Sequence, residues 1–158
     1  MRARIIALYT SPVLALLFRV ILGVIFLYAG VIKIVDPLGF AQALYNYRIL
    51  PGWMINPAAI ILPWVEVMVG GSLLLGIRTL GGGLLVSSLL WIFALALGIN
   101  LVRGVDISCG CFSTSNTASP ITWFHLARDL ILLGMGLFIV LFDQGMASLE
   151  RLFRTRSS

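Results

Sequence analysis

Charged residues are scarce in this chain, and their scarcity excludes a soluble globular protein. Lys, Arg, Asp and Glu make up 11% of the 158 residues, hydrophobic residues make up 60%, and the mean hydropathy is +1.07. Soluble domains usually carry about 25% charged residues and about 45–50% apolar residues. A chain of this length could not hide so much apolar surface from water. The sequence therefore predicts an integral membrane protein with a single membrane domain over residues 1–158.

Cysteine and histidine are nearly absent, which limits the chemistry that the chain can support. The two cysteines, Cys109 and Cys111, are separated only by Gly110, and the one histidine is His125. A relay between two cysteine pairs is excluded within this chain, because it has one pair. Zinc would want four ligands, and only His125 and a few carboxylates could complete a set begun by the two cysteines.

The net charge of +5 does not indicate nucleic-acid binding. The basic residues lie at the chain ends and between apolar runs. They do not form a stripe interleaved with aromatic residues that could stack on bases. We therefore interpret the charge as a signal for orientation in a lipid bilayer.

Four apolar segments are each long enough to cross a bilayer, which takes about 20 helical residues. Proline follows Asn56 and Ser119, a pattern typical of a helix N-cap and first helical position. Pro63 is interpreted as a kink inside the second helix, because a helix that began there would be too short to span. Residues 76–83 predict a tight turn. The predicted fold is an all-α antiparallel bundle of four transmembrane helices, at about 12–33, 57–77, 80–102 and 120–142, with loops at about 34–56 and 103–119.

The distribution of basic residues predicts which side of the membrane each loop occupies. Four spans place both termini on one side, and six basic residues belong to that side against three on the other. The six are Arg2, Arg4, Arg78, Arg151, Arg154 and Arg156, and the three are Lys33, Arg48 and Arg103. The positive-inside rule then makes both termini cytoplasmic in a bacterial inner membrane. The cysteine loop would face the periplasm, where disulfides form and persist.

Several ionisable residues lie inside the predicted spans, where an unpaired charge is costly. Glu66 and Arg128 have similar predicted depths, which predicts an ion pair between them. That pair would lock the bundle or, alternatively, form a proton or quinone site beneath the cysteine loop. Asp129 could form an ion pair with Lys33 or border a water-filled pocket.

Two further basic side chains have a structural and a functional interpretation. Arg19 is expected to snorkel to the cytoplasmic surface. His125 is expected near the outer surface, where it could lower the pKa of a thiol or simply form a hydrogen bond within the bundle.

The Cys-Gly-Cys sequence has three interpretations. As a structural staple it would contribute only about 1.6 kcal/mol, because the loop that it closes is so short. Two thiolates also suit a soft metal such as Cu(I), although no second cysteine pair or methionine cluster accompanies them. A reversible thiol–disulfide pair needs only adjacent thiols, a flexible glycine and an oxidising compartment, and this interpretation is favoured.

Nearly the whole chain resembles the MauE/DoxX family of four-helix membrane proteins, and within it the MauE-like branch. The resemblance is carried by "FRVILGVIFLYAGVIKIVDP" (18–37), "YNYRILP" (45–51), "LPWVEVMVGGSLLLG" (62–76), "DISCGCF" (106–112) and "RDLILL" (128–133). It implies a redox-associated protein in which Cys109 and Cys111 take the redox role. MauE-type members are linked to maturation of the small subunit of methylamine dehydrogenase alongside a thioredoxin-like partner. DoxX-type relatives are linked to quinone-dependent or oxidoreductase assemblies.

Together these observations predict a membrane thiol–disulfide component that exchanges disulfides with a thioredoxin-like protein. The predicted site residues are Cys109 and Cys111, supported by Gly110, His125, Glu66, Arg128 and Asp129. A quinone is a conceivable cofactor. Two alternatives stay open, a soft-metal binding or transport protein and a non-catalytic subunit of a quinone-linked membrane oxidoreductase.

Overall fold

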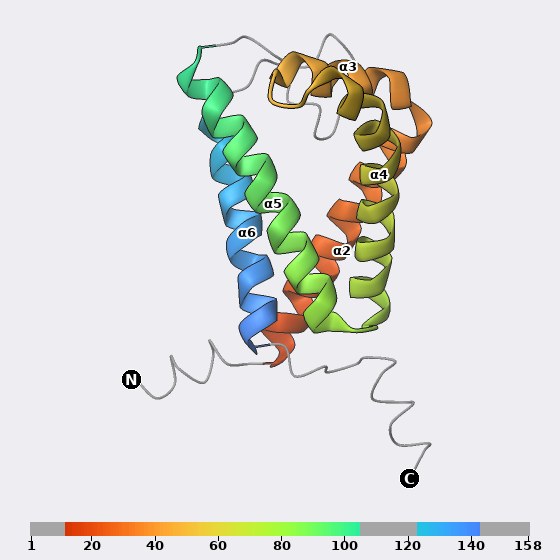
Figure 1. Ribbon diagram of the computed structural model, residues 1–158. Helices are drawn as coiled ribbons and strands as arrows, with labels where there is room; N and C mark the ends of the chain where they lie inside the picture. Colours follow the sequence, from red (N-terminus) through yellow and green to blue (C-terminus); the bar gives the residue numbers. More distant parts are fainter. Residues whose placement is uncertain (1–11, 105–122, 143–158) are drawn as a thin grey trace.

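The computed structural model describes residues 12–104 and 123–142, and within them the chain is almost entirely helical (Figure 1). Four long helices run alternately up and down, which confirms the predicted antiparallel all-α bundle. No strand occurs in these two ranges. The helices are α2 (Pro12–Val35), α3 (Pro37–Tyr47), α4 (Gly52–Leu75), α5 (Thr79–Val102) and α6 (Trp123–Phe142).

The short helix α3 lies across one end of the bundle, within a segment that was expected to be a loop (Figure 1). Asp36 caps it, because its carboxylate accepts a hydrogen bond from the Gly39 backbone N–H at 2.9 Å. Pro37 occupies the first turn, where its missing N–H costs nothing. The helix ends at Arg48, which adopts a left-handed conformation with φ 52°. Asp36-Pro37 is the same cap-and-proline signal that we used elsewhere in the chain, so the sequence contained the information for α3.

Helix α4 begins at Gly52, five residues before the predicted start at Pro57, so the expected loop over 34–56 was wrong. Pro57 and Pro63 both lie inside the helix. Membrane helices tolerate internal proline, because neighbouring helices and local adjustments satisfy the carbonyl groups that it frees. Proline at 57 is therefore not a reliable start signal in a chain this apolar.

The predicted tight turn joins α4 to α5. Gly76 ends α4 in the left-handed region with φ 67°, and its N–H donates to the Leu73 carbonyl. The N–H of Ile77 donates to the Ser72 carbonyl, which completes the termination of the helix. The turn is shorter than expected, since α5 already begins at Thr79 and the three following glycines are helical.

The four long helices form a ring of neighbours in which two pairs pack most closely, α2 with α4 and α5 with α6. Glycine permits the first contact. A Cβ on Gly70 would lie 2.8 Å from the carbonyl oxygen of Gly23, and one on Gly30 would lie 2.8 Å from that of Pro63. Gly136 permits the close contact of α6 with α5 in the same way, because a Cβ on Gly136 would lie 2.7 Å from Ser87 Oγ. Small residues that admit a neighbouring backbone are typical of membrane helix packing.

The outer surface of the bundle is built for lipid. Each of the four long helices is long and apolar enough to cross a membrane. Large apolar side chains such as Trp91, Ile92 and Ile131 are more than half exposed, a pattern that a water-soluble monomer would not sustain. The expectation that Arg19 snorkels to the surface was wrong, because its residue is only 1% exposed. Helix α2, which carries it, packs against both α4 and α6.

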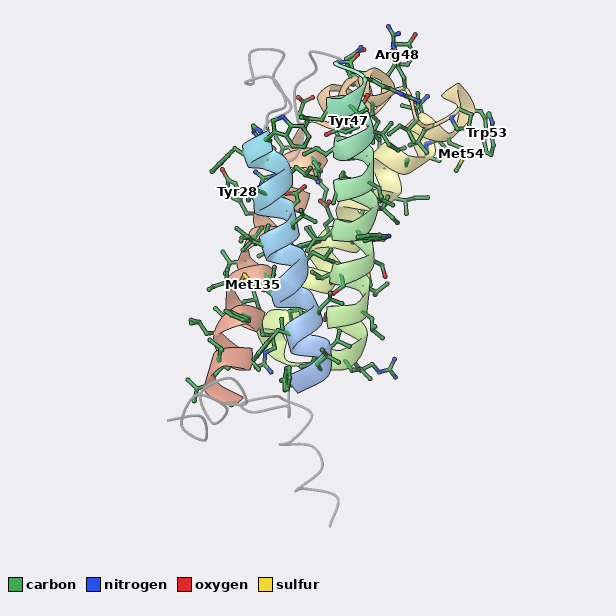
Figure 2. The ribbon with its side chains drawn as sticks, turned by 90° about the vertical axis from the view of Figure 1, so that its left-hand side faces the viewer. Tyr28, Tyr47, Arg48, Trp53, Met54 and Met135 are labelled. Atoms are coloured by element: carbon green, nitrogen blue, oxygen red, sulfur yellow. The ribbon has the colours of Figure 1, made fainter. Side chains whose placement is uncertain are left out.

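The end of the bundle that carries α3 also gathers polar and aromatic residues. Figure 2 shows Arg48 and Trp53 projecting at this end, beside the start of α4. Tyr47, next to Arg48 in sequence, is buried. Gly104 and Trp123, the described residues that flank the 105–122 segment, follow the end of α5 and begin α6 at the same end.

Candidate functional site

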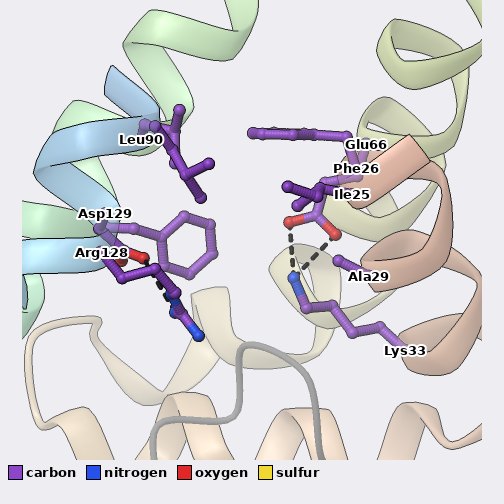
Figure 3. A pocket seen from close by; sticks show the side chains of 10 residues that line it. Ile25, Phe26, Ala29, Lys33, Glu66, Leu90, Arg128 and Asp129 are labelled. Atoms are coloured by element: carbon purple, nitrogen blue, oxygen red, sulfur yellow. Dashed lines mark hydrogen bonds and ion pairs between the residues drawn. The ribbon is translucent and has the colours of Figure 1, made fainter. Parts of the chain in front are cut away.

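A cavity of about 40 Å³ inside the bundle, which we call the charged cavity, collects ionisable side chains from three helices (Figure 3). By the usual allowance of about 10–15 Å³ for each water, it has room for about three water molecules. Lys33 comes from α2, Glu66 from α4, and Arg128 and Asp129 from α6. Phe26 and Phe93 contribute apolar walls.

Lys33 and Glu66 form a buried ion pair. The Lys33 Nζ donates to both carboxylate oxygens of Glu66, at 2.6 and 2.7 Å, and each side chain is only 3% exposed. The ammonium also lies 5.0 Å from the ring centroid of Phe40 and 5.2 Å from that of Phe93. Two carboxylate oxygens and two ring faces compensate the lysine for the water that it loses.

Arg128 and Asp129 form the second ion pair, between adjacent residues of α6. The Nε and Nη2 atoms of Arg128 donate to Oδ1 of Asp129, at 3.1 and 2.9 Å. Asp129 is buried and Arg128 is partly exposed. Asp129 also lies close enough to Lys33 to interact with it electrostatically, so the two ion pairs face the same space.

The predicted ion pair between Glu66 and Arg128 was wrong. Both residues line the charged cavity, but Glu66 is bonded to Lys33 and Arg128 is bonded to Asp129. Depth along the helices was a poor guide to partners, because it ignores which helices are neighbours. Helix α4 packs closely against α2 and has no extensive contact with α6 within the described ranges. The close approach at Gly30 and Pro63 brings the segments that carry Lys33 and Glu66 together.

Helix α3 carries two buried aromatic residues near the charged cavity, Phe40, whose ring centroid lies 5.0 Å from Lys33 Nζ, and Tyr47. Burial raises the pKa of the Tyr47 phenol well above its ordinary value. The negative charge of Asp129 raises this pKa further, and the positive charge of Arg128 partly opposes the shift. Tyr47 is therefore a neutral phenol within electrostatic range of the second ion pair.

The predicted site residues are only partly brought together. Glu66, Arg128 and Asp129 share the charged cavity. His125 is half-buried one turn before Asp129, with its ring 6.1 Å from that of Phe124. Cys109, Gly110 and Cys111 lie outside the described residues. The described residues on either side of them belong to the ends of α5 and α6 that lie toward α3.

Sequence reasoning named Lys33 only as a possible partner of Asp129, and it missed Phe93 in the cavity wall and Phe40 and Tyr47 nearby. Lys33 was treated as a flanking charge at a helix end, yet it is 2% exposed. The burial of Lys33 was not predicted because α3 was not predicted. A helix that lies across the end of the bundle buries residues that a loop would leave in solvent. Phe93 gives no signal on its own among the many apolar residues of α5.

The arrangement has a chemical consequence. Each anion is matched by a cation, so the charged cavity has no net charge, and it offers hydrogen-bonding groups to water or to a small polar group in an otherwise apolar interior. Across residues 12–104 and 123–142, no three His, Cys, Asp or Glu side chains gather in a way that could hold a metal ion.

Fold and site together define a multi-pass helical membrane protein in which two ion pairs line a cavity between the helices. Comparison with known proteins identifies the family to which the chain belongs. The profile of the family described as methylamine utilisation protein MauE matches residues 11–142. The chain belongs to the MauE family.

Three curated relatives illustrate the similarity, each described as methylamine utilization protein MauE. The one from Paracoccus denitrificans is 31% identical over 82% of this chain and 69% of its own length. That from Methylophilus methylotrophus is 28% identical over 84% and 70%. That from Methylorubrum extorquens is 30% identical over 79% and 67%. No solved structure matches the chain.

Proposed function

We propose that this protein is a membrane thiol–disulfide redox component whose working pair is Cys109 and Cys111. The observation that carries the proposal is the Cys-Gly-Cys sequence, the only cysteines in a chain that belongs to the MauE family. A ring of three residues adds little stability, so a staple is a weak reason for the pair. Gly110 gives the backbone the freedom to accommodate both the closed disulfide and the open dithiol.

The reaction is a two-step exchange with a thioredoxin-like protein. A thiolate of the partner attacks one sulfur of the Cys109–Cys111 disulfide, the S–S bond breaks, and the other cysteine leaves as a thiolate. The second thiolate of the partner then attacks the mixed disulfide. The partner ends as a disulfide, and Cys109 and Cys111 end as a dithiol, which has gained two electrons. The reverse sequence reduces the partner by the same route and restores the Cys109–Cys111 disulfide.

The orientation belongs to the same proposal. Both termini are cytoplasmic in the bacterial inner membrane, and the cysteine loop is periplasmic. The count of basic residues supports this orientation. The periplasmic end is then the one with α3, and Glu66, Arg128, Asp129 and His125 take supporting roles in the proposed site.

The process served is maturation of a disulfide-containing partner protein. The relatives are named for methylamine utilization, and this chain takes a related maturation or redox role in a membrane-bound oxidoreductase system. A soft metal held by both thiolates, and a non-catalytic assembly role, are the competing outcomes of the test below.

The test is to trap the mixed disulfide. Cys109→Ala and Cys111→Ala are each incubated in membranes with the oxidised thioredoxin-like protein, whose disulfide the remaining thiolate attacks, and the cysteine that leaves as a thiolate is alkylated at once. At least one single variant should give a covalent complex on a non-reducing gel that reductant removes, whereas the double variant should give none. Ser113→Ala, a change in the same loop that spares both thiols, is the matched control and should behave as the unmodified chain. Failure to trap a complex, with both thiols reduced and a stoichiometric soft metal present, would replace the redox proposal with the metal alternative. Failure to trap without metal would favour the assembly role.

A further inference from the structure

A second cavity lies between α4 and α5 beneath α3, and we call it the apolar cavity. Its volume is about 220 Å³, and its walls expose only apolar atoms. Tyr47 lines it from α3, Leu62 from α4, and Leu89, Phe93 and Ala96 from α5. Figure 1 shows why there is room at this level, because α4 and α5 meet at the Gly76 turn and diverge toward α3.

A cavity of this size and character is suited to a hydrocarbon. An engineered apolar cavity of about 150 Å³ in another protein stays dry and takes up benzene, so water is a poor occupant here as well. The outer faces of α4 and α5 carry exposed apolar residues and are suited to contact the bilayer. The chains of membrane lipids are therefore the hydrocarbon closest at hand.

The apolar cavity adjoins the charged cavity. Phe93 lines both, and the consecutive residues Leu89 and Leu90 line one each. Tyr47 lines the apolar cavity and lies within electrostatic range of Arg128 and Asp129. A molecule whose chain fills the apolar cavity would thus have its other end at the two ion pairs.

The charged cavity restricts what that other end can be. With about 40 Å³ it accepts a group of the size of a hydroxyl or a carbonyl, not a bulky head. Lys33 is already neutralised by Glu66, and Arg128 by Asp129, so no unmatched positive charge remains in the cavity for a phosphate. An uncharged head with oxygen atoms can still exchange hydrogen bonds with these groups.

We propose that the two cavities form one binding site for an uncharged amphipathic lipid. Its hydrocarbon chain lies between α4 and α5, and its small oxygen-bearing head lies at the Lys33–Glu66 and Arg128–Asp129 pairs. The site is independent of the cysteine pair and goes beyond the thiol–disulfide proposal. A diacylglycerol and a long-chain ring ketone share this chemistry, and the experiment distinguishes them.

The first test compares two lipids that differ only in the head. The full chain in detergent is titrated with diacylglycerol or with phosphatidic acid of the same acyl chains, and bound lipid is counted by native mass spectrometry. Diacylglycerol should bind about tenfold or more tightly than phosphatidic acid, because the latter brings an unmatched charge. A benzoquinone with a decyl chain forms the third arm, and preference for it over diacylglycerol would identify a ring carbonyl as the group that enters the charged cavity. Equal binding of phosphatidic acid and of both uncharged probes would overturn the proposal.

The second test fills the apolar cavity. Ala96→Trp places an indole in it and should weaken binding of the better uncharged probe by about tenfold or more. Leu95→Trp, a change to an exposed neighbour on the same helix, is the matched control and should leave affinity within about twofold. Unchanged affinity in a folded Ala96→Trp variant would contradict the site.

A photoreactive group on the chain of the probe tests the unmodified protein and so does not depend on either variant folding. Crosslinks should fall in the peptides that contain Leu62 of α4 or Leu89 to Ala96 of α5. Crosslinks confined to the lipid-facing side of α2 or α6 would overturn the proposal.

Discussion

Removing either partner of the Lys33–Glu66 pair should destabilise the bundle strongly. The pair is 2.6 and 2.7 Å from nitrogen to oxygen, and both side chains are 3% exposed. Lys33→Met strands the carboxylate, and Glu66→Gln strands the ammonium. Loss of one partner from a buried pair costs about 3–5 kcal/mol, and the few waters that fit the charged cavity favour the lower end, about 3 kcal/mol for each single variant.

The double variant strands no charge, so it should cost no more than either single variant. If the singles cost about 3 kcal/mol each and the double also costs about 3 kcal/mol, the coupling energy is about 3 kcal/mol. The assay is reversible unfolding in mixed micelles, with the free energy of unfolding measured for all four proteins of the cycle.

A second cycle, with Glu66→Gln and Arg128→Met, is the control. These residues line the same cavity without a direct bond, so their coupling should stay below about 1 kcal/mol. Additive effects in the Lys33–Glu66 cycle, or equal coupling in both cycles, would refute the pairing described here.

Three further outcomes are expected. Gly70→Ala should destabilise the protein by about 1–3 kcal/mol, because its Cβ would meet the backbone of α2. Gly71→Ala is the control and should not destabilise the protein, because the space around Gly71 is open. Equal melting temperatures of the two variants would contradict the close helix contact. Folding raises the pKa of Tyr47 above its unfolded value of about 10, so the free energy of unfolding should fall as the pH rises above about 10. Tyr47→Phe should reduce this dependence of stability on pH. The same dependence in the variant as in the unmodified protein would argue against a buried phenol. A membrane-impermeant maleimide applied to intact cells after mild reduction should label Cys109 and Cys111, and labelling seen only after lysis would reverse the proposed orientation.

Most of the fold follows from hydropathy alone. Each spanning helix must satisfy its backbone hydrogen bonds internally, so long apolar runs have few other structures available to them. The turn at Gly76 was equally readable, because glycine ends helices in the left-handed conformation. Helix α3 does not follow from hydropathy, because its 11 residues are too few to span a bilayer and its signal is the Asp36-Pro37 cap.

The candidate site was harder to predict, because ion pairs depend on which helices are neighbours. Glu66 and Arg128 were correctly singled out as costly inside a membrane, and both line one cavity. The partner of Glu66 depends on the glycine contacts between α2 and α4, which leave no trace in charge or depth, whereas Arg128 pairs with its own neighbour Asp129 in α6. In the sequence, Lys33 is a charge at the end of an apolar run, and its burial depends on α3, which the sequence prediction lacked.

The oxidation state of Cys109 and Cys111 in working cells tests the central claim most directly. Cells are quenched with acid, free thiols are alkylated with a heavy maleimide, and the mass shift of the protein gives the fractions of dithiol and disulfide. The account predicts both forms in membranes, with the balance shifting when the thioredoxin-like partner is deleted and returning when it is restored. A pair that stays in one form whether or not the partner is present would contradict it.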